Sequence, residues 1–189
     1  ILKFNSMIRN ENERMNKYVE RILLQAKLDR REVHLKKVPV NLNVLVDEAV
    51  EHFRLQVEEK GGVIRAELDP EGYVISADEV HMLNVVCNLI DNAIKYSHDS
   101  LNIYIYTKQE GNRFIIGVRD TGIGIPKEAQ DKVFKRFYRV PSGNVHNVKG
   151  FGLGLSYAKS IVELHGGEIQ LTSKKNKGTQ VEIIFKMES

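Results

Sequence analysis

The sequence is poor in the features of disulfide-stapled and membrane-spanning proteins. Its 189 residues include a single cysteine, Cys87, which excludes an internal disulfide and a cysteine-based zinc site. No apolar run approaches the roughly 18 residues that a bilayer-spanning helix needs. Lys and Arg number 28 against 25 Asp and Glu, a net charge of +3 with the signs interleaved. The charge pattern therefore demands neither nucleic acid nor an anionic membrane as a partner.

The remaining composition is that of an ordinary globular domain. Hydrophobic residues make up 42% and charged residues 28% of the chain, and a chain of this length can bury a core unaided. The length predicts one domain with a modest appendage. Because the chain opens with Ile1 rather than Met and shows no signal-peptide pattern, we expect it to be a fragment of a longer protein.

Residues 1–31 predict a separate helix. They contain no Gly or Pro, and apolar residues recur close to a heptad spacing. These residues are Ile1, Phe4, Ile8, Met15, Tyr18, Ile22 and Ala26. Such a stripe must be buried, either on the helix's own domain or in a helical-bundle dimer, and the segment alone favours neither. Residues 32–40, with Pro39, break the pattern and predict a linker.

From residue 41 onward the patterns predict helices grouped with antiparallel hairpins. Asn41 is a candidate N-cap for a helix that ends at Gly61 and Gly62. The further expected elements are strands 63–68 and 73–76, a helix at 78–97, a hairpin of 101–108 with 113–120, a helix at 153–165 and a hairpin of 168–173 with 179–186. This order predicts a two-layer α/β sandwich rather than a doubly wound parallel sheet.

The helix expected at 78–97 has an unusual polar face. On a wheel that starts at Val80 and turns about 100° per residue, the apolar side chains gather beside Val80 on one side. They are Leu83, Val86, Cys87, Leu89, Ile90, Ala93 and Ile94. The opposite side carries Asn84, Asn88 and Asn92, four residues apart. Asn is a poor helix former, so this stack costs helix stability unless the amides bind something.

The chemistry of this face suits a nucleoside triphosphate. A neutral amide oxygen is a hard ligand that fits Mg²⁺, which takes its remaining ligands from water and phosphates. Lys95 lies one turn from Asn92 and can meet a phosphate as a point charge. Asp91 is the one carboxylate on this face.

Two glycine runs follow the asparagine helix. Asp120 ends a predicted strand and precedes Thr121-Gly122-Ile123-Gly124-Ile125-Pro126, where a ligand can approach bare backbone. The run 150–155, GFGLGL, opens the helix expected at 153–165, and glycines at a helix N-terminus suit phosphate. The spacing matches neither the Rossmann fingerprint nor the P-loop, so both of these nucleotide folds are excluded.

Five motifs in order resemble those of sensor histidine kinases. They are NLIDNAIKYS (88–97), DTGIGIP (120–126), FKRFYRV (134–140), GFGLGL (150–155) and GTQVEI (178–183). The resemblance covers residues 41–189 and extends to the superfamily of gyrase, heat-shock chaperone and mismatch-repair ATPases. It implies a Bergerat-type ATP-binding fold, an α/β sandwich with a mixed sheet, and a lid at about 126–152. Residues 1–31 resemble the second helix of the family's dimerisation hairpin.

The resemblance implies a set of phosphate-binding and catalytic residues. Asn92 would coordinate Mg²⁺, with Asn88 beside the phosphates. Lys95 would contact the phosphates, and Arg139 of the lid would steady the transferring γ-phosphate. The residues that would wrap the phosphates are Gly152, Leu153 and Gly154.

The same resemblance implies how the base is held. Asp120 would accept a hydrogen bond from the exocyclic amine of adenine, and Gly122 and Gly124 would admit the ring. Thr179 would lie under the adenine, and Tyr96 would face the ribose. Ile125 completes the expected nucleotide-binding set. Phe134 and Phe137 are expected to pack the lid rather than to take part in chemistry.

None of the six histidines has the context of the family's phosphoacceptor box. The resemblance therefore implies an acceptor histidine upstream of Ile1, on the dimerisation helix of a homodimer. It further implies ATP and Mg²⁺ as cofactors and relay of the phosphoryl group to a response-regulator aspartate. The parent would be a membrane-anchored bacterial sensor kinase whose cytoplasmic portion includes this chain.

Position 88 separates the alternatives. A superfamily ATP hydrolase or an anti-sigma serine kinase carries Glu four residues before the metal-binding Asn, where it can act as general base. Asn88 cannot take a proton, which favours transfer to a histidine, itself a competent nucleophile near pH 7. A nucleotide-binding interaction module without transfer activity is the remaining alternative, and the intact motifs argue against it.

Overall fold

The computed structural model describes residues 8–9, 11–12, 15–16, 19–20, 22–23, 26–27, 30, 32–97, 101–140 and 151–187. The chain divides into two compact units, Ile1–Leu35 and Lys36–Ser189. In the first unit the described residues from 8 to 27 are helical, as expected. Ile8, Met15, Val19 and Leu23 expose more than half of their surface there. Ile1, Phe4 and Tyr18 lie outside the described residues.

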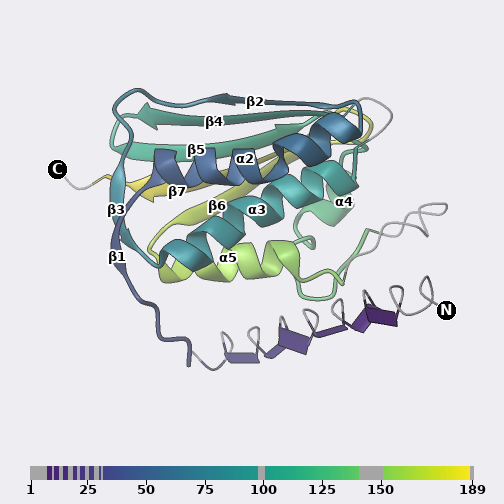
Figure 1. Ribbon diagram of the computed structural model, residues 1–189, viewed down its shortest axis with the longest axis horizontal. Coiled ribbons are helices and arrows are strands. Elements are labelled where there is room, and N and C mark those ends of the chain that lie inside the picture. Colours follow the sequence, from purple (N-terminus) through teal and green to yellow (C-terminus); the bar gives the residue numbers. More distant parts are fainter. Residues whose placement is uncertain are drawn as a thin grey trace. The chain divides into compact units, whose positions relative to one another are not determined.

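The second unit is a layer of helices against one face of a five-stranded sheet (Figure 1). The sheet order is β2-β4-β5-β7-β6, with β2 parallel to β4 and the other pairs antiparallel. The strands are β2 (Val63–Glu67), β4 (Asn102–Glu110), β5 (Arg113–Asp120), β6 (Glu168–Lys174) and β7 (Gly178–Lys186). The helices are α2 (Leu42–Glu59), α3 (Glu79–Lys95), the short α4 (Lys127–Gln130) and α5 (Gly154–Leu164). The predicted two-layer sandwich with a mixed sheet is confirmed.

Helix α2 begins as its sequence predicts. The Oδ1 atom of Asn41 accepts a hydrogen bond from the backbone N–H of Asn43 at 2.9 Å, which satisfies one of the donors that a helix start leaves open. The helix buries one stripe against the sheet, namely Leu42, Leu45, Val46, Ala49, Val50, Phe53 and Val57. It ends where the Gly62 N–H reaches back to the Val57 carbonyl.

A short strand occupies part of the segment that the sequence predicts as a linker. Strand β1 (Val38–Asn41) pairs antiparallel with β3 (Val74–Ala77), and Pro39 lies within it. Residues 36–40 therefore belong to the second unit, and the expected linker at 32–40 is too long at its C-terminal end. Proline is tolerated here because each strand of a two-stranded sheet is an edge.

The face of the sheet beneath the helices changes from apolar to polar at one end. The paired residues Val118, Val181 and Leu171 form an apolar row across β5, β7 and β6. Two residues further along, the same face carries Asp120, Thr179 and Ser173, because side chains alternate with a period of two. This polar row lies at the edge of a core that contains Phe114, Ile116, Ile105 and Ile183.

Candidate nucleotide-binding site

Helix α3 is capped by Asp78, whose Oδ1 accepts a hydrogen bond from the His81 N–H at 3.1 Å. Its buried stripe consists of Met82, Val85, Val86, Leu89, Ile90, Ala93 and Ile94. Val80 is 66% exposed, so its expected place in the core is wrong. The buried stripe is centred roughly 140° away from Val80 on the wheel. The polar face carries the three asparagines as predicted.

The structure brings two of these asparagines to the start of α5. A Cβ added at Gly154, the first residue of α5, would lie 3.6 Å from Asn92 Nδ2 and 3.7 Å from Asn88 Oδ1. Asn84 is exposed and is not among the atoms nearest to Gly154. Within the described residues, the side-chain amides of Asn88 and Asn92 make no hydrogen bond. Two amide oxygens without partners thus adjoin a helix N-terminus.

The N-terminus of α5 has the properties of an anion site. Its N-cap is Leu153, which provides no side-chain cap, so the first N–H groups are not satisfied by a capping side chain. The Leu153 side chain is buried. Open N–H groups beside neutral amide oxygens suit a phosphate that arrives with Mg²⁺. The residues expected to hold the metal and phosphates therefore fit that role chemically.

Lys95 already has a partner on its own helix. Its ammonium pairs with the carboxylate of Asp91, one turn earlier, and both side chains are about one-third exposed. Lys95 was expected from the sequence to face a phosphate. In the structure the charge of Lys95 is balanced by Asp91. Contact with a phosphate would require the ammonium to leave Asp91 or to contact both groups at once.

Asp120 is half-buried and only one of its carboxylate oxygens is occupied. Oδ1 accepts hydrogen bonds from the backbone N–H groups of Gly122 at 2.7 Å and Thr179 at 3.2 Å. Among the described residues, Oδ2 has no hydrogen-bond partner. Burial raises the pKa of Asp120 above its ordinary value, and the two N–H donors partly offset that rise. The carboxylate is therefore fixed by one oxygen and open at the other.

The glycines after Asp120 fit closely against the protein's own backbone. A Cβ at Gly122 would lie 2.2 Å from the Tyr96 carbonyl oxygen, which also accepts a hydrogen bond from the Ile123 N–H. Gly124 has φ +64°, and a Cβ there would lie 2.1 Å from the Lys174 carbonyl oxygen. Both positions require glycine for packing of the chain itself. Their expected role of admitting the adenine ring stays a prediction, and Tyr96 contributes its backbone to this loop.

A polar network that the sequence did not predict joins this loop to the β6–β7 hairpin. Ser173 Oγ accepts a hydrogen bond from the Ile125 N–H at 2.8 Å and contacts Thr179 Oγ1 at 2.9 Å. Gln130 Nε2 donates to the carbonyl oxygens of Ile125 and Ser173. A Cβ at Gly178 would lie 1.9 Å from the Asp120 carbonyl oxygen. One signal in the sequence could have indicated it: Ser173 lies two residues after Leu171 in the same strand, so both side chains are on the face of the sheet that packs against the helices.

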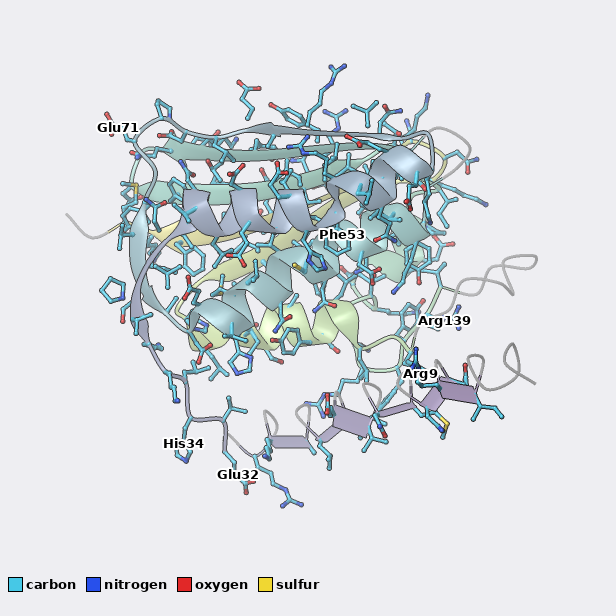
Figure 2. All side chains as sticks on the ribbon, viewed as in Figure 1. Arg9, Glu32, His34, Phe53, Glu71 and Arg139 are labelled. Atoms are coloured by element: carbon cyan, nitrogen blue, oxygen red, sulfur yellow. The ribbon has the colours of Figure 1, made fainter. Side chains whose placement is uncertain are left out.

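A residue inside the expected lid is hydrogen-bonded to the C-terminal end of that lid. The Phe137 N–H donates to the Gly152 carbonyl at 2.9 Å, and Gly152 has φ +70° with its open side against the Tyr138 carbonyl. Arg139 is exposed, and Figure 2 shows it at the opposite end of the domain from Glu71. Residues 141–150, most of the remaining lid, lie outside the described residues.

The two lid phenylalanines behave differently. The Phe134 ring is half-buried, with the Lys159 ammonium 5.7 Å from its centre. Phe137 is 59% exposed and adopts φ +58°, so its expected packing role is wrong. A bulky residue with positive φ is held there by its surroundings, here by the hydrogen bond to Gly152.

Comparison with known proteins places the site in a family. Residues 77–189 match the family described as histidine kinase-, DNA gyrase B-, and HSP90-like ATPase. This stretch contains every residue of the candidate site. The chain belongs to this family. Membership in a family that contains histidine kinases agrees with the resemblance carried by the five motifs.

Individual histidine kinases resemble most of this chain. Sensor protein RprX of Bacteroides fragilis (strain YCH46) is 41% identical over 178 residues, which are 93% of this chain and 34% of RprX. The catalytic domain of the histidine kinase ThkA is 26% identical, with a TM-score of 0.69 over 80% of this chain and 96% of that domain. A structure of ThkA in complex with the response regulator TrrA gives 25% identity and a TM-score of 0.74 over 96% of this chain and 50% of that one. The chain spans about a third of the length of the curated relatives it matches.

The described histidines of this ATPase-family chain have structural or surface positions. His165 Nε2 accepts a hydrogen bond from the Asp78 N–H at 2.9 Å, and its Nδ1 lies 2.7 Å from the Ile161 carbonyl. This pattern requires the neutral ring, and burial lowers the pKa of His165. His81 bonds to the Tyr157 hydroxyl, and His34 and His52 are exposed. His98 and His146 lie outside the described residues.

Two features are absent from the described part of the chain. No group of three or more His, Cys, Asp or Glu side chains is arranged to hold a metal ion in the described part of the chain. No described helix combines the length and apolar character that crossing a membrane requires.

Proposed function

We propose that this chain is the ATP-binding catalytic part of a sensor histidine kinase, which transfers the γ-phosphate of ATP to a histidine outside residues 1–189. The observation that carries the proposal is the carboxylate of Asp120, held through one oxygen by two backbone N–H groups while the other oxygen has no partner among the described residues. An open carboxylate oxygen accepts hydrogen bonds only, and adenine offers an amine at the matching edge.

The phosphate end of the site is formed by α3 and α5. Asn92 would hold Mg²⁺ through its amide oxygen, and Asn88, also on α3, lies close to the start of α5. The N–H groups that begin α5 bind the phosphates, and Gly154, which has no side chain, allows close approach. When bound, Mg²⁺ neutralises phosphate charge and orients the γ-phosphate. Arg139 of the lid and Lys95, once released from Asp91, supply further positive charge.

Transfer is favoured over hydrolysis by the chemistry of position 88. The Asn88 side chain, on α3, lies close to the start of α5, where a superfamily hydrolase would need a carboxylate to take a proton from water. An amide cannot act as that base. A histidine acceptor needs no such base near pH 7, because its neutral ring nitrogen is already a nucleophile.

The partners follow from the same proposal. The exposed apolar residues of the N-terminal helix, Ile8, Met15, Val19 and Leu23, would pair with a second copy of the chain in a homodimer. A response-regulator receiver domain would take the phosphoryl group, a role supported by the likeness to ThkA in its complex with TrrA. The longer protein would be anchored in a bacterial membrane with this part in the cytoplasm.

The experiment uses the longer protein that contains this chain. Incubation with ATP labelled in the γ-phosphate should give protein-bound label that is lost in acid and retained in alkali, as expected for phosphohistidine. Asn92→Ala should remove nearly all of that label, and Asn84→Ala, on the same helix face but exposed, should retain it. Acid-stable label, or free phosphate without labelled protein, would contradict the proposal.

A further inference from the structure

Three polar side chains form a row across the end of the sheet, and only two of them belong to the expected site. Ser173 on β6 faces Thr179 on β7, and Thr179 neighbours Asp120 on β5. Ser173 Oγ has three contacts within hydrogen-bond distance. It lies 2.8 Å from the Ile125 N–H nitrogen, 2.9 Å from the Gly178 carbonyl oxygen and 2.9 Å from Thr179 Oγ1.

The single hydroxyl proton of Ser173 determines the direction of its three hydrogen bonds. A serine hydroxyl has one proton to donate and two lone pairs that accept. The Ile125 N–H can only donate and the Gly178 carbonyl can only accept, so the proton of Ser173 goes to Gly178. The third contact is then a hydrogen bond only if Thr179 donates its own hydroxyl proton to Ser173. In that arrangement Ser173 is fully satisfied, and the lone pairs of Thr179 Oγ1 are left to accept.

We infer that Ser173 is a positioning residue for base selection, which acts through Thr179. By drawing away the hydroxyl proton of Thr179, Ser173 leaves an acceptor beside the open acceptor of Asp120. Two acceptors side by side favour a purine that carries an amine at position 6 and repel one that carries a carbonyl there. The inference rests on the proposed function, because it requires the base to bind at Asp120.

Loss of the serine hydroxyl has a specific consequence. In Ser173→Ala the hydroxyl of Thr179 has no acceptor on β6 and can turn its proton toward the bound base. A donor at that point tolerates a carbonyl oxygen. A purely structural role of Ser173 would instead weaken binding of every purine nucleotide by the same factor.

The test compares ATP with inosine triphosphate, whose base carries a carbonyl in place of the adenine amine at position 6 and a proton on the neighbouring N1. Dissociation constants of both are measured by calorimetry with Mg²⁺ for the wild type, Ser173→Ala and Ser173→Thr. We expect Ser173→Ala to reduce the preference for ATP about three- to tenfold, the range that one hydrogen bond provides. Ser173→Thr retains a hydroxyl and should keep the wild-type preference.

The same substitution in a Thr179→Val variant shows whether Ser173 acts through Thr179. In Thr179→Val there is no hydroxyl to orient, so adding Ser173→Ala should leave the ratio of the two dissociation constants unchanged. An equal fall of the ratio in both backgrounds would overturn the inference, as would parallel weakening of both nucleotides in Ser173→Ala alone. Both of those results leave ATP binding and the proposed function intact. A wild-type chain that binds neither nucleotide would overturn the proposed function and the inference with it.

Discussion

Replacing Asp120 by Asn changes one atom of the site and leaves its frame in place. The amide oxygen of Asn can still accept hydrogen bonds from the Gly122 and Thr179 N–H groups, as Oδ1 does now. The open oxygen becomes an NH₂ group, which donates and no longer accepts. The substitution therefore removes the acceptor for the adenine amine without removing the contacts that hold the side chain.

The magnitude follows from the kind of hydrogen bond that is lost. A hydrogen bond to a charged group contributes roughly 1.5–3 kcal/mol. Asp120→Asn should then weaken ATP binding by about tenfold to a hundredfold. GTP should gain relative to ATP, because the new NH₂ group can donate to the guanine carbonyl. The wild type should prefer ATP over GTP by at least about tenfold on the same argument.

Stability is expected to move in the opposite direction. Burial raises the pKa of Asp120, so the folded protein holds a proton there more strongly than the unfolded chain does. At a pH above 3.8, the ordinary pKa of Asp, the ionised Asp120 carboxylate therefore lowers the free energy of unfolding. The neutral amide of Asn does not have this effect. Asp120→Asn should unfold at the same temperature as the wild type or higher.

Calorimetric titration of both proteins with ATP and GTP, together with thermal unfolding at pH 7, measures all of these quantities. A wild type that binds GTP as tightly as ATP would refute the role of Asp120 in selecting the base. So would an Asp120→Asn variant that is as stable as the wild type and retains full ATP affinity.

Three further predictions concern the metal site, the pH dependence of stability and the glycine loop. Asn92→Ala should remove most of the Mg²⁺ dependence of ATP binding, measured by titration with and without Mg²⁺, whereas Asn84→Ala should not; equal effects would mean that the helix face is only structural. The free energy of unfolding should fall as the pH drops below about 6.5, because His165 is held neutral when folded but takes up a proton when unfolded. Denaturant titrations between pH 5 and 7 should show a weaker pH dependence of the free energy of unfolding in His165→Gln than in the wild type. The same pH dependence in both proteins would rule out a contribution from His165. Gly122→Ala should lower the free energy of unfolding by about 1–3 kcal/mol, because its Cβ meets a carbonyl oxygen. Gly154→Ala, whose Cβ would meet nothing nearer than 3.6 Å, is the control, and equal unfolding midpoints for the two would contradict the packing argument.

The sequence predicts local features of this protein well. The cap at Asn41 and the asparagine face of α3 depend on residues within a few turns of one another, and the structure contains both. The two-layer sandwich follows from the order of such elements. The extent of the core on α3 was harder to predict, because the wheel gives a periodicity and not the direction of the sheet, and Val80 is consequently exposed.

Features that depend on distant segments could not be predicted. Strand β1 exists because residues 74–77 pair with it, more than thirty residues away. The contact of Ser173 with Thr179 depends on the register of β6 and β7, which places the two residues opposite each other. Gly122 was expected to make room for the adenine ring. In the structure the carbonyl of Tyr96, at the end of α3, fills the space where a side chain would be. Lys95 was expected to meet a phosphate, yet the nearest opposite charge is Asp91 on its own helix.

A crystal structure of the chain with Mg²⁺ and a non-hydrolysable ATP analogue tests the central claim most directly. The account predicts that the adenine amine lies within hydrogen-bond distance of Asp120 Oδ2. It also predicts Mg²⁺ on the amide oxygen of Asn92 and phosphates against the first N–H groups of α5. A base bound away from Asp120, or phosphates that do not approach Asn88, Asn92 and the start of α5, would contradict it.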